Sequence, residues 1–266
     1  MGEAIVVTSG KGGVGKTTTT ANIGTALALA GKKVCLVDTD IGLRNLDVVM
    51  GLENRIIYDL VDVVEGDCRL HQALIKDKRF DCLYLLPAAQ TKDKSAVEPS
   101  QMKKLVDELK QDYDYILIDC PAGIEQGFKN AVAGADKAVV VTTPEISSVR
   151  DADRIIGLIE KEEHISSPKL IINRIRPHMM KNGDAMDVEE IVSILAIDLL
   201  GIVIDDDDVI KSSNKGEPIA TDPKSKASIA YRNIGRRITG ETVPLMSLDE
   251  KKGVFKKVKD FLGIRG

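Results

Sequence analysis

Short runs of apolar, β-branched residues alternate with longer segments of helical periodicity along almost the whole chain. The runs contain few polar side chains, which is typical of strands that are buried on both faces. They predict strands at residues 4–8, 33–37, 82–86, 115–118, 138–142, 169–172 and 201–204. The segments between them predict helices at residues 17–30, 101–110, 126–133, 149–162, 188–195 and 225–239.

This alternation predicts an α/β fold, with a doubly wound, mostly parallel sheet flanked by helices. The chain has 266 residues, of which 43% are hydrophobic, and this is enough for one large core. We expect a single domain over residues 1–243, a polar linker over 244–253 and a separate tail over 254–266. Ligands of such sheets bind at the carboxyl ends of the strands, so the polar residues just past each strand are the candidates for function.

A glycine-rich loop follows the first predicted strand directly and has the pattern of a phosphate-binding P-loop. Its glycines let backbone N–H groups curl around phosphate, Lys16 suits the β and γ phosphates, and the hydroxyl of Thr17 suits Mg²⁺. The pattern therefore predicts bound ATP and Mg²⁺ on a P-loop NTPase fold. The residues expected to contact the nucleotide here are Gly10, Lys11, Gly12, Gly13, Val14, Gly15, Lys16, Thr17 and Thr18.

Lys11 is a second lysine, close to the start of the same loop. One nucleotide needs only Lys16, and a side chain that leaves the first turn of the loop points outward rather than into its own phosphate cradle. Lys11 therefore suggests a site that is completed by a second subunit.

Polar residues follow three other predicted strands. Asp119 closes an apolar strand in the Walker B position, where it would hold Mg²⁺ directly or through water. Gly123 offers a backbone N–H to the γ-phosphate. Asp40 is the candidate for polarising the attacking water, and Asp38 is a less favoured metal ligand. Asn173 carries an amide suited to reading the adenine edge.

Each of these residues also has a purely structural interpretation. An aspartate at a strand end is often a helix N-cap, which is the alternative for Asp119. Asp38 and Asp40 are equally consistent with solvated loop charge. Asn173 commonly satisfies turn backbone. The proximity of a P-loop favours the functional interpretation for Asp119 most strongly.

The C-terminal tail has the pattern of an amphipathic membrane-binding helix. At about 100° per residue its apolar positions fall on an arc of roughly 120°, while three lysines lie off that arc. Bulky apolar residues beside basic ones suit an anionic lipid interface. The alternative is a terminal helix docked on the core or in a partner's groove. The predicted membrane contacts are Val254, Phe255, Val258, Phe261 and Leu262.

Charge and hydropathy narrow the choice of partners. The formal net charge is −4, which argues mildly against nucleic acid as a specific partner. No stretch has the roughly 20 apolar residues of a spanning helix, and the first residues lack the layout of a signal peptide. We therefore expect a cytoplasmic protein that is peripheral on the inner face of the cell membrane.

Four motifs resemble those of the deviant Walker A ATPases, the MinD/ParA class of P-loop proteins. They are KGGVGKTT at 11–18, DTDIGLRNLD at 38–47, DCPAG at 119–123 and NKGEP at 214–218. Within the class the chain is similar to the branch that selects the bacterial division site. The resemblance covers nearly the whole chain, and GLRNLD at 42–47 is more specific than the P-loop.

This resemblance implies an ATPase that is a homodimer when ATP is bound. Lys11 would reach the partner's phosphates, Lys16 and Thr17 would serve their own site, and Asp40 would support hydrolysis. It also implies a MinC-like inhibitor of FtsZ assembly as a partner, and positioning by a MinE-like activator or a polar scaffold. Slow turnover, stimulated by dimerisation, membrane or partners, is part of the same expectation.

The sequence departs from the class at residues 203–206. The usual Ile-Pro-Glu-Asp is Val-Ile-Asp-Asp here, so no adenine contact can be assigned to this segment. The acidic run 205–208 is consistent with a solvated helix start, where negative charge suits the helix dipole.

Three rival functions share parts of the pattern. A ParA-type partition ATPase would bind DNA through basic residues such as Arg232, Arg236 and Arg237, but the tail and the net acidity disfavour it. An iron–sulfur carrier needs paired cluster cysteines, whereas those of this chain are scattered. A flagellar-placement ATPase of the FlhG type would usually carry a segment before the first strand, which here begins by Ala4.

Overall fold

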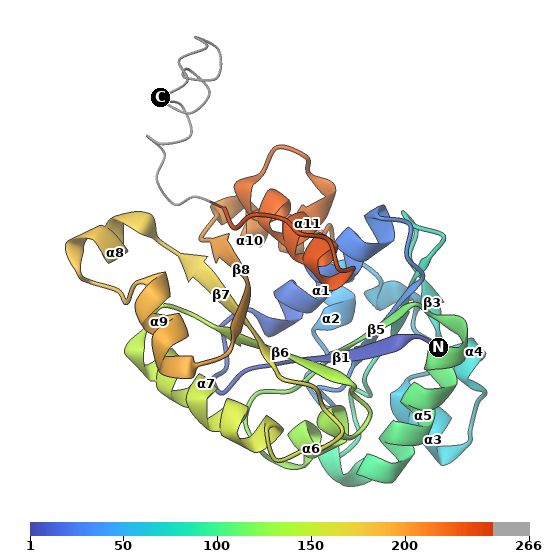
Figure 1. The fold of residues 1–266 in the computed structure, drawn as a ribbon. Helices are drawn as coiled ribbons and strands as arrows, with labels where there is room; N and C mark the ends of the chain where they lie inside the picture. The colour runs from blue at the N-terminus through green and yellow to red at the C-terminus, as the bar shows by residue number, and fades with distance from the viewer. Residues whose placement is uncertain (247–266) are drawn as a thin grey trace.

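A computed structural model describes residues 1–246 of the chain (Figure 1). The predicted membrane contacts Val254, Phe255, Val258, Phe261 and Leu262 lie outside the described residues, as does most of the predicted linker. Within the described part, no helix is both long and apolar enough to cross a bilayer.

One eight-stranded sheet forms the centre of the fold, in the order β3-β4-β2-β5-β1-β6-β7-β8. All neighbouring strands pair in parallel except β3, which is antiparallel to β4. The predicted parallel sheet is therefore confirmed. The strands are β1 (Glu3–Thr8), β2 (Val34–Asp38), β3 (Ile75–Lys76), β4 (Leu83–Leu86), β5 (Tyr115–Asp119), β6 (Lys137–Thr142), β7 (Lys169–Ile175) and β8 (Asp198–Ile204).

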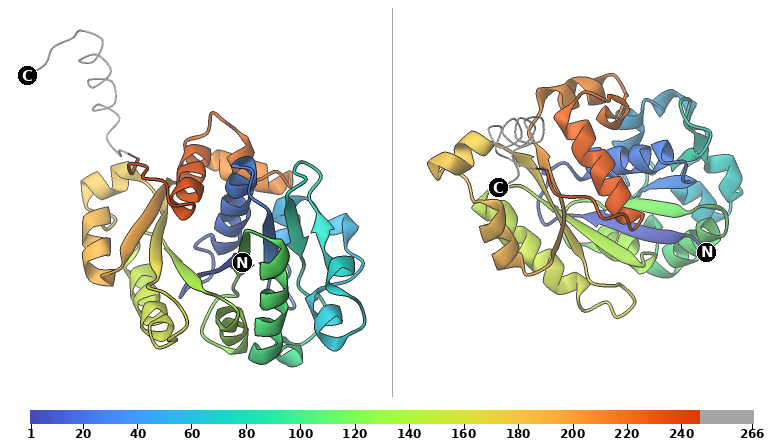
Figure 2. Two further views of the ribbon diagram at one scale, coloured as in Figure 1. Left: turned by 45° about the vertical axis from the view of Figure 1, so that its right-hand side comes forward. Right: turned by 45° about the horizontal axis from the view of Figure 1, so that its top comes forward.

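Helices cover both faces of this sheet (Figures 1 and 2). The described helices are α1 (Lys16–Leu29), α2 (Leu46–Met50), α3 (Leu60–Glu65), α4 (Leu70–Ala73), α5 (Pro99–Asp112), α6 (Gln126–Ala133), α7 (Ile146–Ile159), α8 (Pro177–Asn182), α9 (Val188–Leu195), α10 (Asp207–Asn214) and α11 (Lys226–Ile238). Short 3₁₀ turns occur at Glu53–Arg55, Lys94–Ala96 and Ile219–Thr221.

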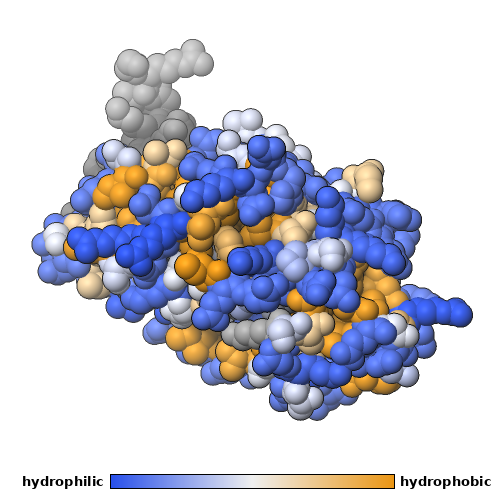
Figure 3. All heavy atoms as spheres, turned by 90° about the horizontal axis from the view of Figure 1, so that it is seen from below, coloured by the Kyte–Doolittle hydropathy of each residue, from blue (hydrophilic) through white to orange (hydrophobic). Residues whose placement is uncertain are grey.

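The two faces of the sheet form two separate hydrophobic cores, because successive side chains of a strand point to opposite faces. In β1, Ala4 and Val6 pack in the core under α3, α5, α6, α7 and α9. Ile5 and Val7 pack in the other core, under α1, α2 and α11. Viewed from the side of α6 and α7, the surface is mainly hydrophilic, with apolar patches separated by polar groups (Figure 3).

Every strand and helix predicted within residues 1–246 is present, with ends shifted by a few residues. Sequence patterns did not predict α2, α3, α4, α8, α10 or β3. Most of these contain two to six residues, which is shorter than the window over which periodicity is informative. The eight-residue α10 was expected only as an acidic helix start, and Asp206 does cap it by accepting a hydrogen bond from the Asp208 N–H.

Candidate functional site

The P-loop connects β1 to α1 at the carboxyl edge of the sheet. Gly15 has a φ of +94° and precedes the first residue of α1, and its own carbonyl accepts the Thr19 N–H at 2.9 Å. A Cβ at Gly15 would lie 2.4 Å from Nδ2 of Asn173, and one at Gly10 would lie 2.1 Å from the carbonyl oxygen of Asp151. Glycine is therefore required at both places, and the loop leads its N–H groups into a helix N-terminus suited to phosphate.

Lys16, Thr17 and Thr20 lie close to the Walker B carboxylate of Asp119. Thr20 Oγ1 donates to Asp119 Oδ1 at 3.1 Å, and Thr17 also hydrogen-bonds Asp119. Lys16 and Asp119 are both buried. The predicted proximity of the P-loop and Asp119 is confirmed, and the N-cap interpretation of Asp119 is wrong, because α6 begins only at Gln126 and Glu125 precedes it.

Asp38 and Asp119 form a buried carboxylate pair. They occupy opposite positions in the register of β2 and β5, and both are almost completely buried. Burial raises the pKa of Asp119 above its ordinary value, and repulsion from Asp38 raises it further, against lowering contributions from Thr17, Lys16 and Thr20. Burial likewise raises the pKa of Asp38. A divalent cation beside Asp119 would relieve such repulsion, so this end of the sheet fits Mg²⁺.

The segment 40–47 is organised around Asp38. Asp38 accepts the Asp40 N–H at 2.9 Å and the Leu46 N–H at 3.2 Å. The fully buried Asp47 forms an ion pair with Nε of Arg44 at 2.9 Å. Burial raises the pKa of Asp47, and the Arg44 charge opposes that shift. Asp40 is thereby held beside the carboxylate pair, whereas Asp38 uses its oxygens to fix the loop.

Lys11 points away from its own phosphate cradle. Its side chain is exposed, and Nζ donates to Oγ of Ser147 at 2.9 Å, in the first turn of α7. Gly123, in the loop after β5, is partly exposed and has a φ of +95°. Both residues therefore lie at the open edge of the site, where a second molecule has access.

Asn173 connects the P-loop to a cavity of about 280 Å³. Its Nδ2 donates to the Val14 carbonyl at 2.9 Å, and the residue is buried. The register between β7 and β8 shifts at this point, and Arg174 adopts a φ of +54°. The expected role of Asn173 is thereby refined, since one of its two amide N–H groups already holds the loop, while the second N–H and the oxygen remain for a ligand.

The segment 203–206, whose sequence differs from the usual one of the class, lines this same cavity. The cavity is bounded by the P-loop, by the ends of β7 and β8 and by α10, which places a base-sized space next to the phosphate loop. The missing proline thus leaves the pocket in place. The cavity is lined by Gly15, Thr18, Asn173, Arg174, Arg176, Val203, Ile204, Asp205, Asp206, Asp207, Val209, Ile210, Ser213, Asn214 and Tyr231.

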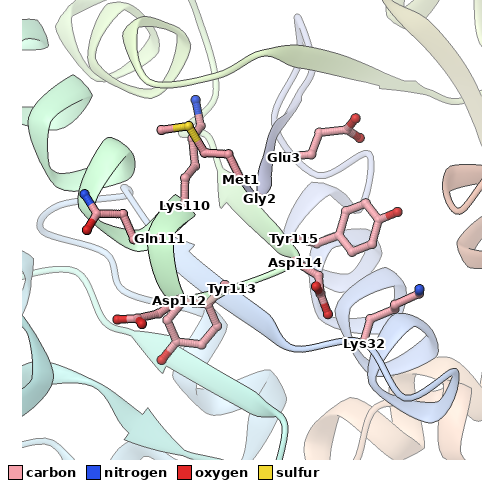
Figure 4. Close-up of a pocket in the computed structure, with 10 residues that line it drawn as sticks. All are labelled: Met1, Gly2, Glu3, Lys32, Lys110, Gln111, Asp112, Tyr113, Asp114 and Tyr115. Atoms are coloured by element: carbon pink, nitrogen blue, oxygen red, sulfur yellow. The ribbon is translucent and has the colours of Figure 1, made fainter.

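A larger cavity, of about 430 Å³, lies at the opposite edge, where β1 and β5 begin. Its side chains fan apart rather than converge on one point (Figure 4). Two of its charged groups are already engaged: Lys110 pairs with Asp136 at 2.6 Å, and Asp114 accepts the Lys33 N–H at 2.8 Å. Parallel sheets bind ligands at the other edge, so this cavity is not assigned to the site.

The three arginines named for a DNA-binding alternative already have partners within the chain. Arg232 donates to the carbonyls of Ala220 and Thr221, and Arg236 pairs with Glu241. Arg237 donates to three main-chain carbonyls. The basic face of α11 is therefore largely committed to internal contacts, which disfavours the partition alternative.

Two site residues were missed by the sequence reasoning. Thr20 lies one helical turn after Lys16, so the i, i+4 spacing carried a usable signal. No sequence signal pointed to Ser147, because its contact with Lys11 joins residues 136 positions apart.

Comparison with known proteins gives a consistent answer. The sequence model of the CobQ/CobB/MinD/ParA nucleotide binding domain matches residues 5–219. The septum site-determining protein MinD of Bacillus subtilis is 75% identical, with all of both chains covered.

Solved structures agree with the sequence relatives. A MinC:MinD cell division protein complex from Aquifex aeolicus matches with a TM-score of 0.86 and 52% identity, over 92% of this chain and 99% of that one. MinD of Pyrococcus horikoshii, complexed with Mg-ADP, matches with a TM-score of 0.81 and 31% identity, over 90% of this chain and 96% of that one. The chain therefore belongs to the MinD/ParA family of nucleotide-binding proteins, and within it to the septum site-determining MinD branch.

Proposed function

We propose that this protein is an ATP-dependent, dimerising ATPase that places the bacterial division site by recruiting a MinC-like inhibitor of FtsZ assembly. Relatives that are named septum site-determining proteins support this assignment, as does a solved relative described as a MinC:MinD complex. The observation that carries the chemistry is the P-loop with a buried carboxylate pair behind it and an exposed lysine in front of it.

Each residue of the site has a defined task in this proposal. Lys16 binds the β and γ phosphates, Thr17 holds Mg²⁺, and Asp119 holds the ion through water. When bound, Mg²⁺ neutralises charge on the phosphate oxygens and polarises them. Asp40 orients the attacking water, and its backbone contact with Asp38 sets its position. Gly123 donates its N–H to the γ-phosphate.

A second copy of the chain completes the site. The loops after β2, β5 and β6 share the edge that carries Lys11, and each exposes a large apolar side chain: Leu43 is 66% exposed, Ile124 57% and Ile146 61%. Exposed apolar groups around a polar site are typical of an interaction surface. In the ATP-bound homodimer, Lys11 leaves Ser147 and contacts the partner's phosphates.

Because each subunit carries one tail, dimerisation also recruits the protein to the membrane. Each lysine near an anionic leaflet contributes about 1 kcal/mol, and burial of the five apolar side chains adds to this. Ordering a short helix opposes binding by about 1 kcal/mol or more per residue. One tail therefore binds weakly, whereas two tails on one dimer raise the apparent affinity by about 10²-fold.

Nucleotide turnover then returns the protein to the cytoplasm. Hydrolysis is slow and is stimulated by dimerisation, by the membrane or by partners. A MinE-like activator or a polar scaffold sets where on the inner face of the membrane the protein accumulates.

The test is sedimentation with anionic vesicles in ATP or ADP, alongside light scattering for the oligomeric state. We expect a dimer that pellets with vesicles only in ATP. Lys11→Ala should remove both the dimer and vesicle binding, and Phe261→Glu should remove vesicle binding alone. Equal pelleting in both nucleotides, or an unchanged dimer for Lys11→Ala, would contradict the proposal.

A further inference from the structure

The last six described residues form a strap beside β8. Gly240, with a φ of +90°, ends α11, and the Glu241 N–H closes the turn on the Arg236 carbonyl at 3.0 Å. Residues 241–246, here called the strap, then return from the end of α11 and lie next to β8 (Figures 1 and 2). Met246, the last of them, packs against both hydrophobic cores.

One guanidinium joins the strap to the sheet. Arg237 donates from Nε to the Val243 carbonyl at 2.9 Å, and from Nη2 to the Pro244 carbonyl at 2.7 Å. Its Nη1 donates to the Leu200 carbonyl of β8, also at 2.9 Å. The planar fork of arginine suits such a set of acceptors, which the single ammonium of a lysine cannot reproduce.

The β8 carbonyl that accepts from Arg237 belongs to a strand at the edge of the sheet. Among the strands of residues 1–246, β8 pairs only with β7, and Leu200 is skipped in the register between the two strands. At the next residue, Gly201, a Cβ would lie 2.4 Å from Cγ1 of Ile234 and 3.4 Å from Nη1 of Arg237. The absence of a side chain there lets α11 approach β8 closely enough for Arg237 to reach Leu200.

We propose that Arg237 is a clamp that fixes the starting point of the C-terminal tail on the ATPase body. This proposal rests on the proposed membrane role of residues 254–266. With the clamp closed, the tether runs from Met246 to the membrane segment; with the clamp open, it starts near Gly240 and is about twice as long. The effective concentration of the second tail falls with roughly the −3/2 power of tether length, so vesicle affinity of the dimer drops about two- to threefold.

The experiment compares Arg237→Ala and Arg237→Lys with Arg236→Ala in the full chain. Arg236 lies on the same helix, and its ion pair with Glu241 is half exposed, so its loss has little effect. Hydrogen exchange of the strap, ATP-dependent dimerisation and binding to anionic vesicles are measured for each. We expect the Arg237 variants to dimerise normally, to exchange the strap faster and to bind vesicles about two- to threefold less tightly.

A compensating deletion tests whether Arg237 acts by setting the length of the tether or only by stabilising the fold. Removing residues 247–252 shortens the tether by the length of the strap without changing net charge, since two acidic and two basic residues are lost. Combined with Arg237→Ala, this deletion should restore vesicle binding. Unchanged strap exchange, unchanged vesicle binding or failure of the deletion to rescue would overturn the clamp. Wild-type protein that ignores vesicles in ATP would overturn the membrane role itself.

Discussion

The phosphate side of the site and the base side differ in how deeply their polar groups are buried. At the ends of β1, β2 and β5, Lys16, Asp38 and Asp119 are nearly inaccessible to solvent. At the ends of β7 and β8, Arg174, Arg176 and most polar residues up to Asn214 remain partly or fully exposed. Buried charges are costly unless each has a partner, so the phosphate side tolerates few changes of residue, whereas the base side tolerates many.

Removing one charge of the buried pair tests this contrast most strongly. Asp119→Asn should lower Mg²⁺-dependent ATP hydrolysis by about 10²-fold or more, because the ion loses its carboxylate anchor. The same substitution should stabilise the nucleotide-free protein at pH 7.5 by about 1–2 kcal/mol, because a charge that burial disfavours is removed, together with its repulsion with Asp38.

The sign of the Asp119 pKa shift determines how the stability of the protein depends on pH. The pKa of Asp119 is raised in the folded protein, so the folded state binds more protons than the unfolded state between the two pKa values. Stability of the nucleotide-free wild type should therefore fall as pH rises from about 4 towards 7, and the variant should show a smaller slope, because only the buried Asp38 of the pair still contributes. Denaturant unfolding at several pH values measures it, with the exposed Asp198→Asn as control. A slope equal to that of the wild type would refute the pair.

Asn173 is a buried polar residue on the base side, and the next largest effect is expected there. Asn173→Asp keeps the shape but cannot donate to the Val14 carbonyl, so the P-loop loses one anchor. We expect about tenfold weaker Mg-ADP binding by calorimetry, equivalent to about 1.4 kcal/mol. Arg176→Ala, which removes an exposed side chain of the same cavity together with its ion pair to Asp205, should change affinity less than twofold. Equal losses in the two variants would show that burial does not separate the two sides.

The smallest effect is expected for a substitution of Ser147, because its hydrogen-bond partner Lys11 is an exposed residue of the phosphate side. Ser147→Ala removes a hydrogen bond that holds Lys11 to its own chain. The ATP-bound dimer should become about two- to fivefold tighter in sedimentation velocity, since one exposed hydrogen bond contributes about 0.5–1 kcal/mol. The exposed Ser166→Ala serves as control. A weaker dimer would mean that Ser147 presents Lys11 to the partner instead of retaining it.

The same contrast explains how much the sequence could predict. Residues of the phosphate side follow buried strands directly, so an apolar run ending in Asp38 or Asp119 marks them. The sheet was predictable for the same reason. The base side is assembled from a register shift in β7, a short acidic helix and the Asn173 side chain within β7, and none of these has a periodic signature. Asn173 and Val14 are 159 residues apart in sequence, and only the folded sheet brings them together.

The central place of β1 has a consequence for biosynthesis. It is the first strand to be made, yet both of its partners, β5 and β6, come more than 100 residues later. At about 5–20 residues per second, the ribosome leaves the β1 segment unpaired for on the order of ten seconds. A strand of Ala, Ile and Val that waits this long needs either a chaperone or early cover from α1, and truncated chains that end before residue 142 should aggregate.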